Sequence, residues 1–334
     1  MTNSKSKVLV IGGDGLLGSH LVRKLIEQDY RVRVFIHPES NSPTLDDLPI
    51  ERVKGDLLSP NGDVERAIKD CRFVFHLAAV TDLWASPDVT WKVNLEGTRK
   101  VLDACLSAKV QRLIFTGSAS SFRFGTLARP GDEQGDFPGE YKGIAYMESK
   151  HQAMRLVQQY VAGRGLDAVI VAPTFLLGRL DWRPSSGELI RQFLTRKMIF
   201  TSPGGRNFAY APDVADAMVS ALTKGKIGQA YIAGGVNLSY LDFFSKVASI
   251  EGRVNPPRFV LPGKAILAAG AAASLYGKIF SQKPKLNLTT ANLSLFGTYY
   301  SAAKSIRELE MPQTDIETAI EESIGSLREF GHIQ

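Results

Sequence analysis

The sequence VLVIGGDGLLGSHL, Val8 to Leu21, decides the fold of this chain. Its apolar run ends at Gly12, and an apolar pattern with helical spacing follows the glycines. This order predicts a strand, a tight turn and a helix, which together open a dinucleotide-binding βαβ unit. Glycines permit the sharp turn, the close approach of the backbone to a pyrophosphate, and tight packing of the helix on the strand. The N-terminus of such a helix presents N–H groups to the phosphates.

Two glycine spacings overlap in this loop. Gly13-x-Gly15-x-x-Gly18 fits the general dinucleotide fingerprint, and Gly12-x-x-Gly15-x-x-Gly18 fits the form typical of short-chain dehydrogenases/reductases. A surface turn is the alternative interpretation, but the position between a strand and a helix favours the nucleotide site. The residues of this segment that we expect to bind the cofactor are Gly12, Gly15, Leu16, Leu17 and Gly18.

The composition is that of a globular protein, and it excludes several classes of function. With 334 residues, 44% of them hydrophobic, the chain can form one or two domains with a large core. The net charge is +6, but no dense Lys/Arg run occurs, so we do not expect nucleic-acid binding. The five histidines lack zinc-site spacing, so no metal is predicted.

Two further features bear on the compartment. The two cysteines, Cys71 and Cys105, lie in or beside apolar segments, and we expect them to be buried and reduced in a cytoplasmic protein. The longest apolar stretch, Ala265 to Leu275, is shorter than the ~20 residues that a membrane-spanning helix needs, so we predict no integral membrane segment. A buried or interface helix is expected there, with peripheral membrane contact as the lesser alternative.

Strand and helix patterns alternate through the first half of the chain. The repeated β-then-α order implies a parallel sheet covered by helices on both faces. Because crossover connections are right-handed, we predict an α/β fold with a Rossmann-type doubly wound parallel sheet. The predicted strands are 7–11, 31–36, a third ending near 53, 73–77, 112–115 and 168–171, and the predicted helices are 16–28, 63–69, 87–108 and 145–163.

After Pro173 the pattern changes to proline-containing loops, helices and short apolar strands. This change predicts a smaller C-terminal substrate-binding lobe. One later segment, 213–233, is expected to return to the first domain. We therefore expect a nucleotide-binding domain over 1–172 with 213–233, and a substrate-binding lobe over 173–212 and 234–334.

Two side chains suited to acid–base chemistry lie in the predicted helix 145–163. Tyr146 and Lys150 are four residues apart and so share one helix face. An ammonium at this position lowers the pKa of the phenol, which is otherwise about 10 and too high for proton transfer near pH 7. Ser118 follows a strand, at the carboxyl end where ligands bind in open α/β sheets. We therefore predict Ser118, Tyr146 and Lys150 as catalytic residues; a turn serine and a solvated Tyr/Lys pair are the structural alternative.

Further motifs accompany these residues: Gly55-Asp56-Leu57, His76-Leu-Ala-Ala79, Val93-Asn94-Leu-Glu-Gly97-Thr98 and Pro173-Thr174. In their order and spacing, all these motifs together resemble the extended short-chain dehydrogenase/reductase family, over nearly the whole chain. Within it, the chain is most similar to the dihydroflavonol-4-reductase-like branch and to the bacterial hopanoid-associated sugar epimerases. Leu83-Trp84 and Tyr231-Ile-Ala-Gly-Gly235 resemble the bacterial group.

The resemblance implies roles for individual residues. Ser118 would orient the substrate carbonyl, Tyr146 would be the acid–base, and Lys150 would bind the nicotinamide ribose. The family often forms dimers through its long helices, so a homodimer is expected through 87–108 and 145–163. Outside the glycine loop, the cofactor-binding residues that the resemblance implies are Asp56, Leu57, Ala78, Ala79, Lys150 and Pro173.

The chain departs from the family pattern near the expected substrate site. Gly117 stands where the family has the first serine of Thr-Ser-Ser, and Ser120 and Ser121 leave the choice of serine open. The segment ASSFRFG after Ser118 is longer than usual, and the neighbouring 133–143, rich in glycine, proline and acids, is predicted to be a mobile loop. The candidate substrate contacts are Trp84, Phe122 and Arg206, with core packing as the alternative for Phe122 and a solvated loop for Arg206.

Three functions are compatible with these motifs, and the enzymatic ones act on small molecules. The first is a carbonyl reductase or alcohol dehydrogenase, the second a nucleotide-sugar epimerase or dehydratase with tightly bound NAD, and the third a non-catalytic dinucleotide-binding regulator. The presence of Ser118, Tyr146 and Lys150 disfavours the regulator. Ala172 stands where sugar epimerases often carry an asparagine, whereas Arg206 matches an arginine that grips the diphosphate in those enzymes. We favour the reductase.

The choice of dinucleotide depends on the end of the second predicted strand. NAD-specific folds carry an acid there that binds the ribose 2′-OH. This strand ends at His37, and no acid occupies positions 34 to 38. The related reductases have arginine at that point, and an imidazole can also donate to a 2′-phosphate, with Arg33 or Ser40 assisting. We therefore predict a preference for NADP(H), with NAD(H) as the alternative.

Overall fold

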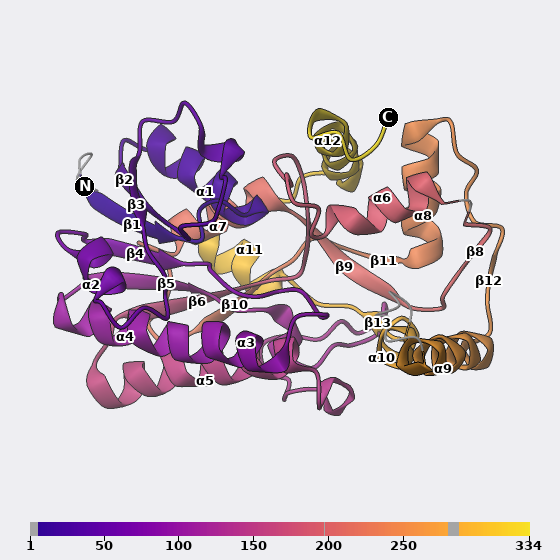
Figure 1. Cartoon of the computed structure of the whole chain (residues 1–334), viewed down its shortest axis with the longest axis horizontal. Helices are drawn as coiled ribbons and strands as arrows, with labels where there is room; N and C mark the ends of the chain where they lie inside the picture. Colours follow the sequence, from indigo (N-terminus) through magenta and orange to yellow (C-terminus); the bar gives the residue numbers. More distant parts are fainter. Residues whose placement is uncertain (1–5, 197, 280–286) are drawn as a thin grey trace.

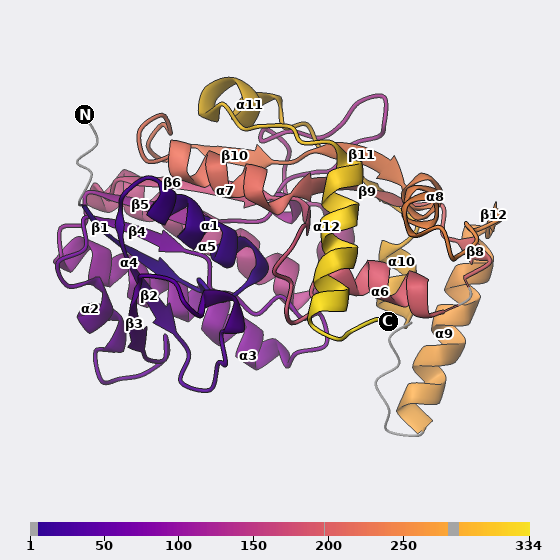
Figure 2. The same cartoon turned by 90° about the horizontal axis from the view of Figure 1, so that it is seen from above.

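A computed structural model describes residues 6–196, 198–279 and 287–334 of the chain. A seven-stranded sheet forms its centre, and each neighbouring pair of strands in it is parallel (Figures 1 and 2). The spatial order is that of a doubly wound Rossmann sheet, as predicted. The strands in this order are β3 (Glu51–Lys54), β2 (Arg31–Ile36), β1 (Lys7–Ile11), β4 (Phe73–His76), β5 (Arg112–Thr116), β6 (Ala168–Pro173) and β10 (Ala230–Ala233).

Helices cover both faces of this sheet, which explains why its central strands are apolar on both sides. On one face, α1 and α7 pack side by side over Val10, Val34 and Val171, and α11 completes the layer beside β10. On the other face, Leu9, Phe115 and Ile170 lie under the remaining helices (Figure 1). The helices are α1 (Leu16–Glu27), α7 (Ala211–Ser220) and α11 (Ala303–Leu309) on the first face, and α2 (Asp63–Ile68), α3 (Pro87–Trp91), α4 (Thr98–Ser107) and α5 (Ala145–Arg164) on the second.

The predicted helix 87–108 is present with one irregularity. Pro87 stands in its first turn, where a missing N–H costs nothing, and a π-helical segment at Lys92–Gly97 separates α3 from α4. Helix α5 ends at Gly165, which has φ +69° and so supplies the left-handed C-cap. Cys71 and Cys105 are both buried, as expected, and neither forms a disulfide bond.

A second, smaller sheet lies beyond the carboxyl ends of the strands of the large sheet (Figure 1). It has its own core, in which Phe208 stacks on Phe243 with ring centroids 4.1 Å apart. Since β10 pairs with β6, the segment 213–233 lies with the large sheet, and the domain limits at 172/173 and 233/234 stay a prediction. The elements are β7 (Phe175–Leu177), β9 (Gly205–Tyr210), β11 (Val236–Ser239), β13 (Gly297–Thr298), α6 (Gly187–Thr195), α8 (Tyr240–Glu251) and α12 (Ile316–Glu329).

Beyond this sheet, at the end of the molecule opposite the N-terminus, lie β8 (Phe200–Thr201), β12 (Phe259–Val260), α9 (Gly263–Ile279) and α10 (Leu288–Leu293) (Figure 2). The apolar stretch 265–275, expected to form a buried or interface helix, is helical and only partly buried. Ile266 and Gly270 of α9 are buried, but Ala268 and Leu275 are exposed. Within the described ranges, no helix combines the length and apolarity needed to cross a membrane.

Candidate active site

The glycine loop decides which of the two overlapping spacings is the structural one. Gly12 has φ +85°, and a Cβ there would lie 2.6 Å from the main-chain nitrogen of Ala78. A Cβ on Gly18 would overlap the carbonyl oxygen of Gly12, whereas one on Gly13 would clash with Val34 in the core. At Gly15 the space is open, since the nearest atom to an added Cβ is 3.9 Å away. Gly12, Gly15 and Gly18 therefore form the cradle, and Gly13 serves packing.

This cradle fits a pyrophosphate. Gly15 is the N-cap of α1, and among the described residues no side-chain cap accepts a hydrogen bond from this helix N-terminus. The first-turn N–H groups and the positive end of the helix dipole are thus available to phosphate oxygens. Asp14 does not compete for them, because its carboxylate accepts a 2.5 Å hydrogen bond from Ser40. Leu16 and Leu17 are buried at the start of the helix.

The other expected cofactor residues follow successive strands at the same edge of the large sheet. Carboxyl ends of parallel strands meet at one edge, which is where open α/β sheets bind ligands. His37 follows β2, Asp56 follows β3, Ala78 follows β4 and Pro173 ends β6. The residues predicted to bind the cofactor are thus brought to one edge: Gly12, Gly15, Leu16, Leu17, Gly18, His37, Asp56, Leu57, Ala78, Ala79, Lys150 and Pro173.

On the adenosine side, His37 is exposed, and its Nδ1 accepts the N–H of Glu39 at 3.4 Å. The suggestion that Arg33 assists a 2′-phosphate is wrong. Its buried guanidinium donates to the carbonyls of Ala67 and Lys69 at 2.6 and 2.8 Å and pairs with Glu51. Arg183, from the second half of the chain, lies in the loop region after β2, because it donates a 2.7 Å hydrogen bond to Ser40.

On the opposite side of the edge, Lys150 is almost fully buried. Its ammonium donates a 2.6 Å hydrogen bond to the carbonyl of Thr116 and lies 4.8 Å from the ring centroid of Phe115. Burial lowers the pKa of Lys150 to about 7. The neighbouring His76 is also buried, and its pKa falls to about 3 because of burial and the charge of Lys150.

Ser118 and Tyr146 meet next to this lysine. The hydroxyl of Ser118 shares a 2.7 Å hydrogen bond with that of Ser120 and also interacts with the phenol of Tyr146. Burial raises the pKa of Tyr146, while the Ser118 hydroxyl and the charge of Arg206 lower it. The expected effect of Lys150 on this pKa is absent here, since its ammonium is turned to the carbonyl of Thr116.

Asn94 is a residue of this region to which the sequence alone assigned no role. Its amide oxygen accepts the N–H of Val80 at 2.7 Å, and its amide nitrogen donates to the carbonyl of Val80 and to Ser149, both at 3.0 Å. Ser149 in turn donates to the carbonyl of Tyr146 at 3.0 Å. Asn94 therefore ties the loop after β4 to the helix that carries Tyr146. Its place in the motif Val93-Asn94-Leu-Glu-Gly97-Thr98 was the signal in the sequence.

Arg206, on β9, faces the same region from the second sheet. Its guanidinium lies 5.0 Å from the ring centroid of Phe175 and interacts with the phenol of Tyr240, and the phenols of Tyr141 and Tyr300 are close enough to affect its pKa. Among the described residues no carboxylate forms an ion pair with it. A half-buried cation without a carboxylate is suited to an anionic ligand.

The other two candidate substrate contacts lie in different surroundings. Phe122 is 5% exposed and belongs to the core under α4 and α5, so packing is its evident role. Trp84 is half-buried in the loop between β4 and α3. Phe124, by contrast, lies against Tyr141 and Phe296, with ring centroids 5.7 and 5.9 Å away.

The prediction of a mobile loop at 133–143 is not supported by its contacts. Glu133 accepts the N–H of Ile232 at 2.7 Å, and Phe137 packs on His151 with ring centroids 4.7 Å apart. Just before it, Gly125 and Gly131 form isolated β-bridges with Tyr299 and Tyr300. These long-range contacts anchor the segment.

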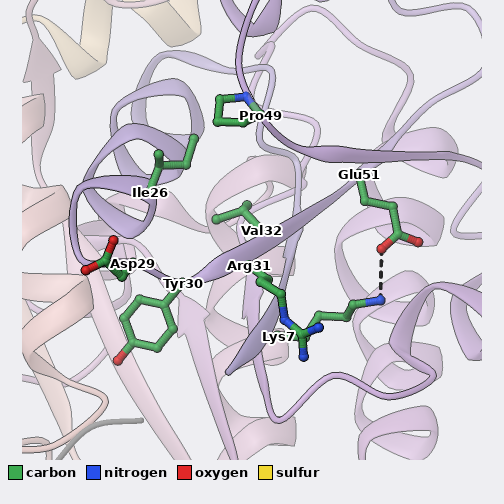
Figure 3. A pocket seen from close by; sticks show the side chains of 8 residues that line it. All are labelled: Lys7, Ile26, Asp29, Tyr30, Arg31, Val32, Pro49 and Glu51. Carbon is green, nitrogen blue, oxygen red and sulfur yellow. Dashed lines mark ion pairs between the residues drawn. The ribbon is translucent and has the colours of Figure 1, made fainter. Parts of the chain in front are cut away.

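A pocket of about 520 Å³ lies outside this site, at the amino ends of β1, β2 and β3 (Figure 3). An ion pair of 2.9 Å between Lys7 and Glu51 borders it, and Tyr30 and Asp29 lie on its other side. Because it opens at the opposite end of the strands, it has no part in the candidate active site.

Comparison with known proteins identifies the family of this chain. Residues 8–234 match the NAD dependent epimerase/dehydratase family. A Synechocystis protein assigned as a dihydroflavonol 4-reductase is 30% identical over 331 residues, covering 97% of this chain and 95% of the relative. Sterol demethylase protein B of Methylococcus capsulatus is 28% identical, with 97% and 99% covered. The crystal structure of gox2253 superposes with a TM-score of 0.86 at 29% identity, covering 98% of this chain and 100% of that one.

Proposed function

Because this chain belongs to the NAD dependent epimerase/dehydratase family, we propose that it is a carbonyl reductase or alcohol dehydrogenase that uses Ser118, Tyr146 and Lys150. The family and its relatives make the chain an NAD(P)-dependent enzyme of the extended short-chain dehydrogenase/reductase type, acting on a small molecule. This coarser assignment disfavours the regulator. The finer assignment, to a ketone or aldehyde substrate, is our proposal.

The observation that carries the proposal is the contact between the hydroxyls of Ser118 and Tyr146 at the carboxyl end of β5, with Lys150 one helical turn away. A bound nicotinamide supplies or accepts the hydride. Ser118 then donates a hydrogen bond to the substrate carbonyl oxygen and orients it. Tyr146 donates its phenolic proton to that oxygen as the carbonyl carbon gains the hydride, which gives the alcohol. In the oxidation direction the same phenolate takes the proton back.

The charges around Tyr146 suit this proton transfer. The phenolate left after donation is stabilised by the Ser118 hydroxyl and by the charge of Arg206. Lys150 would donate to the ribose hydroxyls of the nicotinamide nucleotide, and its ammonium would then leave the Thr116 carbonyl. Asn94 holds the loop after β4 through Val80 and the helix that carries Tyr146 through Ser149.

For the cofactor we propose NADP(H), with NAD(H) as the alternative. The exposed His37 ends β2, and no acid at positions 34 to 38 would repel a 2′-phosphate. The carboxylate in this region, Asp14, accepts a hydrogen bond from Ser40 and pairs with Arg183 at 3.6 Å, which offsets its charge. Arg183 and Ser40 supply a cation and a hydroxyl close by. We also propose a homodimer formed through the helical segment 87–108, which includes α3 and α4, and through α5, as expected from the family.

A second candidate function is a nucleotide-sugar epimerase or dehydratase. The half-buried Arg206, which has no carboxylate partner in the part of the chain that the structure describes, favours it, because a guanidinium binds a diphosphate well. The reductase remains our choice because Ala172 precedes Pro173 at the position where sugar epimerases often carry asparagine.

The purified protein distinguishes the two functions. A reductase is expected to be isolated with an empty site and to oxidise free NADPH when ketones or aldehydes are added. An epimerase is expected to release tightly bound NAD on denaturation and to bind nucleotide sugars in calorimetry. Retained NAD together with no consumption of NADPH across a carbonyl panel would rule out the reductase.

A further inference from the structure

The end of the molecule formed by β8, β12, α9 and α10, which we call the outer face, lacks acidic residues. The sequence contains no Asp or Glu between Glu188 and Asp213, nor between Glu251 and Glu308. The parallel pairing of β8 with β12 brings these two stretches together. Exposed cations remain on them: Arg196, Arg253, Arg258 and Lys264. The two stretches that form the outer face therefore carry a net positive charge and contain no acidic residue of their own.

Large apolar side chains are concentrated on the same face. Of the thirteen that are exposed among the described residues, seven lie here. Phe200 and Phe259 extend side by side from the β8–β12 pair, with ring centroids 6.2 Å apart. Their exposure to water is unfavourable, and gathered exposed apolar groups mark an interaction site. The seven residues are Ile199, Phe200, Phe259, Val260, Leu275, Tyr276 and Leu288.

Helix α9 has an apolar surface on both of its sides. Its buried side packs on α10, where a Cβ on Gly270 would lie 2.5 Å from that of Ala291. Its outward side carries Ala268, Ala272 and Leu275, the last 60% exposed. A helix that faced water would carry polar residues on that side. The only charged side chain described on α9 is Lys264, at its first turn.

We propose that the outer face binds the surface of a bilayer that contains anionic lipids. Helix α9 lies in the interface with its alanine side and Leu275 among the acyl chains, and Arg258 and Lys264 meet the lipid phosphates. Apolar side chains flanked by Lys and Arg are the pattern of helices that bind membrane surfaces. Each basic residue near an anionic membrane strengthens binding about fivefold.

A second copy of this chain fits the outer face less well. In a symmetric dimer the same patch lies on both sides of the interface, so Arg258 and Lys264 of both copies would be buried together. No carboxylate between Glu251 and Glu308 can neutralise them. Like charges buried opposite each other oppose association. Anionic headgroups offer the complementary charge that a copy of this chain lacks.

The outer face also adjoins the candidate substrate site. A Cβ on Gly263, at the start of α9, would lie 3.4 Å from Leu295, and the next residue, Phe296, contacts Phe124. Phe124 contacts Tyr141, whose phenol is near Arg206. Membrane binding would therefore hold the candidate substrate site close to the bilayer, in which apolar carbonyl compounds dissolve. This link to the substrate rests on the proposed function, whereas membrane binding does not.

Vesicle flotation tests the binding with the full-length protein. We expect it to float with vesicles of mixed phosphatidylglycerol and phosphatidylcholine, and to remain unbound with phosphatidylcholine alone. High salt should release it, because the headgroup attraction is screened. The double variant Arg258→Gln/Lys264→Gln should bind roughly 30-fold more weakly, since two basic contacts are lost. Leu275→Glu should weaken binding by about tenfold or more, because a carboxylate would enter the apolar layer.

Matched variants at other exposed positions serve as controls. Ile227→Glu and Lys109→Gln change similar side chains far from the outer face and should bind as the wild type does. Thermal unfolding of each variant separates loss of binding from loss of fold. The proposal is overturned if the wild type does not float with anionic vesicles at low salt. It is equally overturned if sedimentation reveals a dimer that Leu275→Glu dissociates while vesicle binding is absent. These outcomes do not depend on any enzymatic activity.

Discussion

The ammonium of Lys150 donates a 2.6 Å hydrogen bond to the main-chain carbonyl of Thr116, the last residue of β5. This carbonyl and the ring of Phe115 are the groups that stabilise the buried charge of Lys150. A single carbonyl is weak compensation for losing water, which is why the pKa of Lys150 falls to about 7. The protein without cofactor therefore holds a cation that a ligand with hydroxyl groups can satisfy better.

We predict that Lys150→Met stabilises the cofactor-free protein. The folded-state pKa of Lys150 lies below its unfolded value, so the unfolded chain binds more protons between about pH 7 and pH 10. The buried lysine thus destabilises the folded state most below pH 7, where it is charged in both states, and this destabilisation decreases as the pH rises toward 10. Urea unfolding should give Lys150→Met a gain of about 2 kcal/mol at pH 6 and a smaller gain at pH 9. Lys109→Met, at an exposed position, is the control and should change neither value. A loss of stability at both pH values would mean that the bond to Thr116 outweighs the burial.

The second prediction concerns Tyr146→Phe. This variant should fold and bind cofactor as the wild type does, but lose ~10²–10⁴-fold in turnover, because the proton donor is removed. The measurement is kcat on a confirmed carbonyl substrate together with the cofactor Kd. Tyr160→Phe makes the same change in the same helix, where the phenol donates to Asp103 at 2.9 Å instead. It should lower the free energy of unfolding and leave kcat intact. Wild-type turnover in Tyr146→Phe would refute the acid–base role.

The third prediction uses the charge of Arg206. This guanidinium lowers the pKa of Tyr146, so Arg206→Met should raise that pKa. For carbonyl reduction Tyr146 must be protonated, so the alkaline limb of the rate–pH profile should move to higher pH. For alcohol oxidation the rise in activity with pH should also begin later. Arg191→Met, which removes the ion pair with Glu188 on α6, is the control. An unchanged profile with a large loss in substrate affinity would instead favour an anionic ligand, as in the epimerase.

Much of the arrangement of the candidate nucleotide site could be predicted because several of its residues lie in the loops just after strands. Gly12, His37, Asp56, Ala78 and Ser118 stand just beyond β1 to β5 in turn, and a parallel sheet brings such positions to one edge. The local sequence pattern and one topological rule were therefore sufficient to place these residues at one edge. The choice between the two glycine spacings could not be made from the sequence, because it depends on contacts of Gly12 and Gly13 with residues far along the chain.

The substrate side could not be assembled from the sequence, because its residues come from distant segments. Tyr240 and Tyr300 lie near Arg206 because β9 pairs with β11 and β13, which these two residues follow. Tyr141 comes from a third segment, near 139–141. Such pairing leaves no periodic signal in short strands. For the same reason the anchoring of Gly125 and Gly131 by Tyr299 and Tyr300 was missed, and a mobile loop was expected next to it.

The last prediction is the choice of dinucleotide. His37 is exposed at the end of β2, with no acid at positions 34 to 38, and Arg183 lies beside Ser40 in the same region. We expect the wild type to bind NADPH more tightly than NADH. His37→Asp should reverse the preference, changing the ratio of the two Kd values by at least about tenfold, because a carboxylate repels the 2′-phosphate. His37→Ala separates loss of a donor from repulsion and should change the ratio less. Fluorescence titration with both nucleotides at one fixed salt concentration measures the Kd values. Tighter binding of NADH by the wild type would make NAD(H) the cofactor and leave His37 without this role.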